Sequence, residues 1–216
     1  MAMHDKPESP RRHGYAPFGA TLEAPKARPG LYLVATPIGN LGDITLRALE
    51  VLAGADVVAC EDTRVTRKLA DRFGIETPLT PYHDHNAATA RPKLMARLAA
   101  GAAVALVSDA GTPLISDPGY RLVREAQDLG FPVIAVPGAS SVLTALSVAG
   151  LPTDRFFFEG FLPPKQAARQ KRIAALAPMP ATLVLFESGP RIAEALADLA
   201  MGLGARAAAT RRSHAS

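Results

Sequence analysis

The chain has 216 residues, 48% of them hydrophobic, a length that suits one full domain and a smaller second one. No apolar stretch approaches the roughly 20 residues that cross a bilayer, and residues 1–29 lack the apolar segment of a signal peptide. These features argue against membrane insertion and secretion. The single cysteine, Cys60, excludes an internal disulfide, and we expect a buried thiol in a cytoplasmic protein.

The net charge of +4 comes from the two ends of the chain. Residues 1–29 carry five Lys or Arg and three Asp or Glu, and residues 201–216 carry three Arg and no acid, whereas residues 30–200 carry 16 basic and 17 acidic residues. The sequence isoelectric point of about 9.5 therefore reflects the two ends of the chain and is weak evidence for RNA binding. One basic cluster remains within the central region, formed by Lys165, Arg169, Lys171 and Arg172. On a helix, such a cluster contacts a phosphate backbone or, more commonly, is a charged face exposed to solvent.

The first 29 residues mix Pro, Arg, His and Gly without periodic apolar positions, and we expect them to form a disordered leader. From Gly30 onward, short apolar stretches alternate with amphipathic ones, which is typical of repeated βα units in a parallel sheet. This pattern predicts a domain over residues 30–150. Its expected strands are residues 31–36, 56–60, 77–82, 103–108 and 132–137.

A second unit is expected to begin near residue 151, where the helical pattern breaks and an aromatic strand, RFFFEGF, follows. A basic helix, a strand and an alanine-rich helix should follow over residues 165–177, 181–188 and 190–201. We therefore expect a partial α/β domain over residues 151–203. Residues 204–216 have neither periodicity nor caps and are expected to be an aberrant tail.

The loops after the expected strands hold the polar residues, and ligands of parallel α/β sheets bind at the carboxyl ends of strands. After the first strand, TPIGNLGD contains Gly39, which suits either a close backbone approach to a ligand or an ordinary turn. After the second, EDTR places Glu61 and Asp62 beside Arg64, which suits a cation, a proton transfer or a helix cap.

The third loop, YHDHN, contains His83 and His85, two residues apart as in some zinc sites. Because no further Cys or His pair has ligand spacing, we expect no metal. The fourth loop, SDAGTPLISDPG over residues 108–119, is the most specific feature, since so long a loop exceeds what a simple connection needs. Its Asp109 suits the sulfonium or amino group of a cofactor, and VPGASS follows the fifth strand.

Several motifs of other enzyme classes are missing from the sequence. It contains no GxxxxGK[ST] phosphate loop, no GxGxxG after the first strand and no GxSxG. Their absence argues against P-loop nucleotidases, classical dinucleotide-binding dehydrogenases and serine hydrolases.

Together, the loops TPIGN, EDTR, YHDHN, SDAGTPLISDPG and VPGAS resemble the tetrapyrrole-methylase-like superfamily and, within it, the methyltransferases of small-subunit ribosomal RNA. The resemblance implies a two-domain α/β fold, with a parallel-sheet N-terminal domain and a C-terminal α/β domain. It also implies S-adenosyl-L-methionine as cofactor, a homodimer, and methylation of the ribose 2′-oxygen of a cytidine in the decoding centre of 16S rRNA, in the small ribosomal subunit.

Carried over residue by residue, the resemblance implies roles for three groups of positions. Those expected to bind the cofactor are Pro37, Gly39, Asp109, Gly111, Thr112, Ile115, Ser116, Gly138 and Ser140. Arg64 and Asn86 are expected to bind substrate. His83, Glu61 and Asp62 are the candidates for the base that removes the ribose proton.

Two departures from the family pattern keep alternatives open. The pattern ESPHRI appears as ESGPRI, and a motif resembling RELTKLHEE is missing, so we expect an incomplete, C-terminally truncated second domain. One alternative is an inactive remnant that at most binds the cofactor. Another is a relative acting on tetrapyrroles or diphthamide precursors, although the EDTR and YHDHN loops fit it less well.

Overall fold

The computed structural model describes residues 13–116 and 119–211. The chain forms two compact units, the first ending at Ala139 and the second beginning at Ser140, each with its own hydrophobic core. The expected boundary near residue 150 is therefore too late. Helix α5 (Ser141–Ala149) groups with the second unit, where the carbonyl of Val148 accepts a hydrogen bond from Arg211.

The first unit contains a five-stranded parallel sheet in the order β5-β4-β6-β3-β7. All five strands predicted from the sequence are present, as β3 (Gly30–Val34), β4 (Val57–Cys60), β5 (Leu79–Pro81), β6 (Ala103–Val107) and β7 (Val133–Val136). The central strands β4 and β6 are buried along their whole length. Continuous apolar stretches of this kind are typical of strands covered on both faces.

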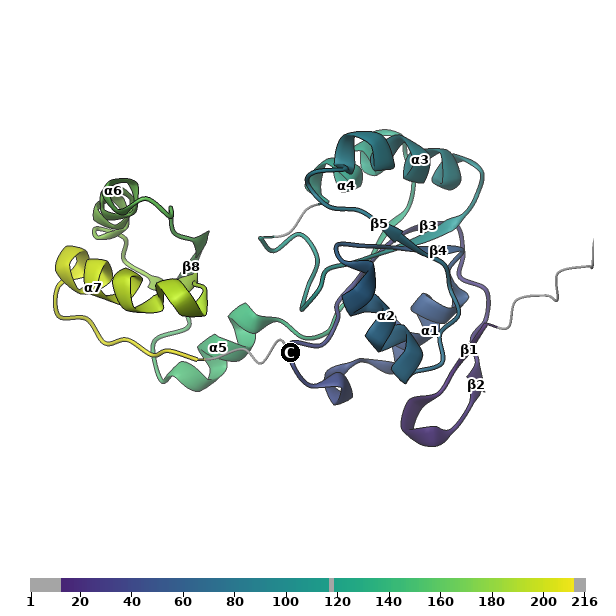
Figure 1. The fold of residues 1–216 in the computed structure, drawn as a ribbon, viewed down its shortest axis with the longest axis horizontal. Helices are drawn as coiled ribbons and strands as arrows, with labels where there is room; N and C mark the ends of the chain where they lie inside the picture. The colour runs from purple at the N-terminus through teal and green to yellow at the C-terminus, as the bar shows by residue number, and fades with distance from the viewer. Residues whose placement is uncertain (1–12, 117–118, 212–216) are drawn as a thin grey trace, which may run out of the picture. The chain divides into compact units, whose positions relative to one another are not determined.

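Two helices cover each face of this sheet (Figure 1). Helices α1 (Leu46–Gly54) and α2 (Thr63–Arg72) pack on one face, and α3 (Ala87–Ala99) and α4 (Tyr120–Asp128) on the other. Each helix follows a strand, so the polar loops at the carboxyl ends of the strands gather at one edge of the sheet. A short 3₁₀ helix, η2 (Leu41–Asp43), lies in the first of these loops.

The expected disordered leader is wrong for residues 13–29, and residues 1–12 lie outside the described part of the chain. Strands β1 (Gly14–Tyr15) and β2 (Leu22–Glu23) form an antiparallel hairpin around the 3₁₀ helix η1 (Pro17–Gly19). The Tyr15 side chain is buried in the core that contains α1 and α2. His13 Nδ1 lies 2.9 Å from the carbonyl of Ala53, and Ala16 donates to Phe73. These contacts offset the entropy lost on ordering.

In the second unit, two parallel strands pack against two helices. Strands β8 (Phe156–Phe161) and β9 (Thr182–Phe186) pair with each other, and α6 (Gln166–Leu176) contacts α7 (Ile192–Leu203), which follows the 3₁₀ helix η3 (Gly189–Arg191). Leu162, Ile173 and Leu176 form the buried centre of this core. The two predicted strands and two predicted helices are thus present.

Half of the basic cluster at and before α6 is engaged in ion pairs within the second unit. The guanidinium of Arg169 is buried and donates to the Asp198 carboxylate on α7 at 2.6 Å. Arg172 pairs with Glu159 on β8. Of the four basic residues that the sequence offered for phosphate contact, Lys165 and Lys171 are left exposed without an ion pair among the described residues.

Candidate functional site

Three of the polar loops meet at the carboxyl edge of the first unit's sheet. The loops after β4, β5 and β6 together line a cavity of about 460 Å³. It contains all three residues expected to act in catalysis, with Arg64 and Asp109. The full lining is Glu61, Asp62, Thr63, Arg64, Pro81, His83, His85 and Asp109.

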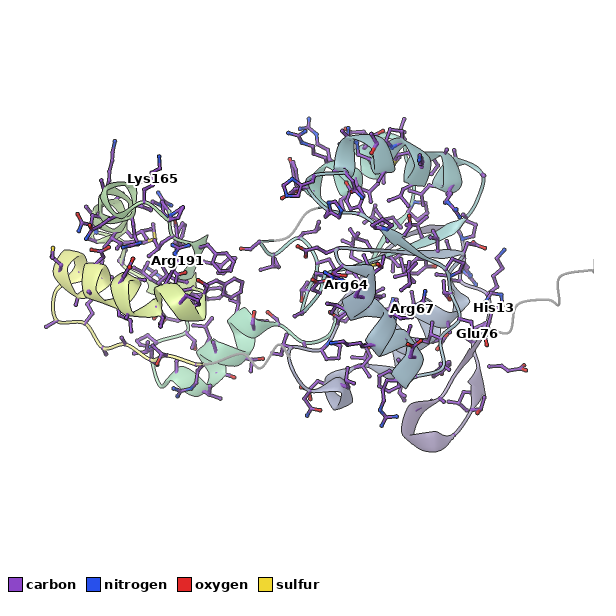
Figure 2. All side chains as sticks on the ribbon, in the orientation of Figure 1. His13, Arg64, Arg67, Glu76, Lys165 and Arg191 are labelled. Atoms are coloured by element: carbon purple, nitrogen blue, oxygen red, sulfur yellow. The ribbon has the colours of Figure 1, made fainter. Side chains whose placement is uncertain are left out.

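Asp62 has a structural role in this cavity. Its carboxylate accepts a hydrogen bond from the backbone N–H of Arg64 at 2.8 Å and so caps α2, and it accepts three more from the Arg64 guanidinium. The side-chain hydrogen bond from Arg64 lowers the pKa of Asp62 to about 2. Such a carboxylate stays ionised and engaged, which makes it a weak proton acceptor. Arg64 lies at the start of α2 (Figure 2).

Asp109 connects the loop after β6 to the loop after β4. Its Oδ1 atom accepts a hydrogen bond from the backbone N–H of Asp62 at 3.0 Å. Partial burial raises the pKa of Asp109, and the neighbouring Asp62 carboxylate raises it further. A partly buried carboxylate of this kind gains from a nearby positive charge, because a cation stabilises its ionised form.

His83 is held in place by Asn86. The Asn86 Oδ1 atom accepts from the His83 backbone N–H at 2.9 Å, and its Nδ2 atom donates to the Pro81 carbonyl at 3.0 Å. Both ends of the amide are therefore used within the loop. Among the described residues, the buried Nδ1 atom of His83 has no hydrogen-bond partner. The rings of His83 and His85 contact each other edge to face, with centroids 6.0 Å apart.

A second group of predicted residues lies around β6, β3 and β7. The loop after β6 is tied to the end of β3, because Thr36 and Gly111 form a backbone bridge. The Thr36 hydroxyl donates to the Ser108 carbonyl, and the Thr112 hydroxyl donates to Ala139. Thr36 and Ser108 were not among the predicted site residues. Both side chains are buried. The sequence feature that could have indicated them is a hydroxyl residue directly after a continuous apolar strand.

Glycines bring the backbones of these loops close together. A Cβ atom on Gly138 would lie 3.0 Å from the Cβ of Ala35, and one on Gly111 would lie 3.3 Å from the Ile38 side chain. Gly111 also has a φ of 83°, which disfavours any other residue. The loops after β3, β6 and β7 thus pack backbone to backbone.

The remaining predicted cofactor residues lie in these loops or just beyond them. Pro37 and Gly39 follow β3, and Ile115 is 40% exposed in the loop after β6. Ser116 has a positive φ of 64°, and Leu114, two residues earlier, has a positive φ of 75°. Such strained backbone conformations are often found at functional sites. Ser140 belongs to the second unit, where its hydroxyl accepts from Leu143 and caps α5.

No three His, Cys, Asp or Glu side chains gather in an arrangement that would hold a metal ion in residues 13–116 and 119–211. Over the same residues, no helix is long and apolar enough to cross a membrane.

The sequence profile of the tetrapyrrole (corrin/porphyrin) methylases matches residues 30–213, which cover the five-stranded sheet of the first unit and most of the second unit. The chain belongs to this methylase family. Its match covers every strand-end loop described above.

Curated relatives of this chain carry a more specific name. It is 60% identical over 183 residues to "Ribosomal RNA small subunit methyltransferase I" of Mesorhizobium japonicum, covering 85% of this chain and 62% of the relative. It is 54% identical to the protein of that name from Pseudomonas aeruginosa, covering 78% and 60%. The chain thus spans less than two thirds of the length of these relatives.

A solved structure supports the fold. The uroporphyrin-III C-methyltransferase of Thermus thermophilus, complexed with S-adenyl homocysteine, superposes with a TM-score of 0.56 at 24% identity. The match covers 82% of this chain and 78% of the solved one. The predicted α/β tetrapyrrole methylase-like fold is therefore confirmed.

Proposed function

We propose that this chain binds S-adenosyl-L-methionine and transfers its methyl group to the ribose 2′-oxygen of a cytidine in the decoding centre of 16S rRNA, within the small ribosomal subunit. The observation that carries the proposal is the 60% identity to a ribosomal RNA small subunit methyltransferase I, in a chain whose strand-end loops line a preformed cavity. Relatives with this name favour it over a tetrapyrrole or diphthamide substrate.

The residues of the first unit fit the proposed cofactor. Asp109 offers a partly buried carboxylate whose raised pKa indicates that a positive charge would stabilise it, as a sulfonium or amino group does. The close-packed loops around Gly111 and Gly138 offer backbone groups to an adenosine moiety. The solved relative with S-adenyl homocysteine belongs to the same fold.

S-adenosyl-L-methionine supplies an electrophilic methyl group when bound, so the protein needs to orient the ribose hydroxyl and accept its proton. We assign the proton acceptor to His83, since Asp62 is occupied by Arg64 and by the α2 cap. Asn86 orients the loop that carries His83. We expect the guanidinium of Arg64, which is exposed beside Asp62, to pair with an RNA phosphate. Glu61 lines the same cavity and remains the second candidate acceptor.

The test is methyl transfer from labelled S-adenosyl-L-methionine to small ribosomal subunits that lack the modification, with mass spectrometry of the 16S rRNA. A 2′-O-methylcytidine in the decoding centre supports the proposal. Cofactor binding without transfer would favour the inactive remnant, and transfer to small tetrapyrroles instead would favour the other alternative.

The resemblance also supports a homodimer that acts in the cytoplasm. Light scattering of the purified chain during size-exclusion chromatography measures its mass in solution. A dimer mass is the expected result, and a monomer mass at micromolar concentration would contradict it.

A further inference from the structure

The second unit carries an aromatic cluster on the face of its sheet that turns away from α6 and α7. On the helix-facing side, Phe157, Leu183 and Leu185 pack against the core of the unit. A bulge between Phe158 and Gly160 shifts the register of β8, so that Phe161 pairs with Phe186 and shares the opposite face with Phe158. The aromatic cluster consists of Phe158, Phe161 and Phe186.

The rings of the aromatic cluster contact one another edge to face. The Phe158 and Phe186 centroids are 4.9 Å apart, and those of Phe161 and Phe186 are 5.6 Å apart. Phe161 is nevertheless 54% exposed, and Phe158 and Phe186 are partly exposed. The cluster includes the last residues of two parallel strands, the end at which α/β sheets bind ligands. An ordered ring with a free face suits stacking on a flat ligand.

The charge of the second unit favours an anionic ligand. Residues 140–211 contain eight Lys or Arg and five Asp or Glu, whereas residues 13–139 contain 12 and 13. Lys165, exposed at the start of α6, follows β8, and Arg191 follows β9 (Figure 2). The Arg191 guanidinium donates to the carbonyls of Leu162 and Pro163 and so fixes the loop between Phe161 and Lys165. Arg191 also pairs with Glu187, so Lys165 rather than Arg191 is available to a phosphate. Aromatic rings combined with basic residues are typical of single-strand nucleic-acid sites.

We propose that the aromatic cluster binds single-stranded RNA, with a base stacked on Phe161 and a phosphate paired with Lys165. This inference rests on the proposed rRNA substrate and gives the second unit a direct part in holding it. Stacking on an aromatic side chain tolerates any base, so the surface should contribute affinity rather than sequence preference.

The experiment measures RNA binding by single-residue variants of the whole chain. Two of them replace the side chain of Phe161, and one replaces that of Lys165. Fluorescence anisotropy with a labelled, unstructured RNA of about 10 nucleotides, a typical single-strand site size, measures the affinity. Phe161→Leu should weaken binding by about tenfold, because it removes one stacking surface, whereas Phe161→Tyr should bind like the parent. Lys165→Gln should weaken binding less and make it less dependent on salt.

The matched control is Met201→Ala, which removes an apolar side chain that is 77% exposed on α7 and should leave RNA affinity unchanged. Calorimetric titration of each variant with S-adenosyl-L-methionine separates this proposal from the proposed function, since Phe161→Leu should bind the cofactor like the parent. Unchanged RNA affinity in Phe161→Leu would overturn the proposal. So would a loss of self-association in that variant without a loss of RNA binding, because the face would then contact a second copy.

Discussion

The two units of this chain differ in how their sheets are covered. In the first unit, five parallel strands lie between two pairs of helices, and the polar loops at their carboxyl ends are bonded to one another. In the second, two strands are covered by α6 and α7 on one face and leave aromatic rings exposed on the other. A sheet covered on both faces leaves its strand-end loops to form a site, whereas a half-covered sheet keeps an apolar face exposed, which is a feature of interaction surfaces.

The largest expected effect tests whether the chemistry lies in the first unit. His83→Ala should lower kcat for methyl transfer by about 10²- to 10⁴-fold, the usual contribution of a general base. The affinity for S-adenosyl-L-methionine should not change. His85→Ala is the matched control on the same loop and should lose far less activity. Equal losses in both variants, measured under single-turnover conditions, would contradict the assignment of His83.

The next effect tests what holds the second unit together. Arg169→Met should lower its free energy of unfolding by about 3 kcal/mol, because the buried Asp198 carboxylate would lose its positive partner and keep a neutral one, the Gln170 amide. Hydrogen exchange of the α6 and α7 amides measures this loss locally. The control Arg172→Met breaks an ion pair that lies nearer the surface and should cost much less. Similar exchange in the two variants would show that the buried pair is dispensable.

A smaller effect tests the order of residues 13–29 in the first unit. A Cβ atom on Gly54 would lie 2.3 Å from the Pro25 carbonyl, so Gly54→Ala should displace this segment and cost about 1–3 kcal/mol. Hydrogen exchange of residues 13–29 should rise. Gly189→Ala is the control, since its Cβ would meet no atom within 4 Å. Unchanged protection in Gly54→Ala would mean that the segment is not held against α1.

The smallest effect concerns the pH dependence of cofactor binding. Burial raises the pKa of Asp109, so the carboxyl takes up its proton at a higher pH than an ordinary aspartate. Because only the ionised form attracts a cation, affinity for S-adenosyl-L-methionine should fall as the pH is lowered, by up to about tenfold per pH unit below that pKa. Titration calorimetry from neutral to acidic pH checks this. Asp109→Asn should bind more weakly and lose the dependence; a variant that keeps the same pH profile would contradict it.

Strand and helix positions in both units could be predicted, because buried parallel strands are continuous apolar stretches and their helices have an apolar face. That residues 13–29 are ordered could not be predicted, because their hydrogen-bond partners at Ala53 and Phe73 are distant in sequence and the segment has no apolar periodicity. The burial of Arg169 was missed for a similar reason. Its partner Asp198 lies on another helix, and a single helix pattern cannot indicate such a pair.

The strand-end loops were correctly predicted to gather at one edge of the sheet, but not what each side chain does there. Asp62 was a candidate base, and its carboxylate caps α2 and binds Arg64 instead. Asn86 was expected to contact substrate, and its amide is used within its own loop. The type of a residue limits its chemistry, whereas its hydrogen-bond partners decide which role remains open to it.

The most direct test of a preformed cofactor site in the first unit is calorimetric titration of the full chain with S-adenosyl-L-methionine, alongside Asp109→Asn. We predict saturable binding at one site and a clear loss of affinity in the variant. A folded parent protein that releases no heat of binding, or a variant that binds equally well, would contradict the account of this site.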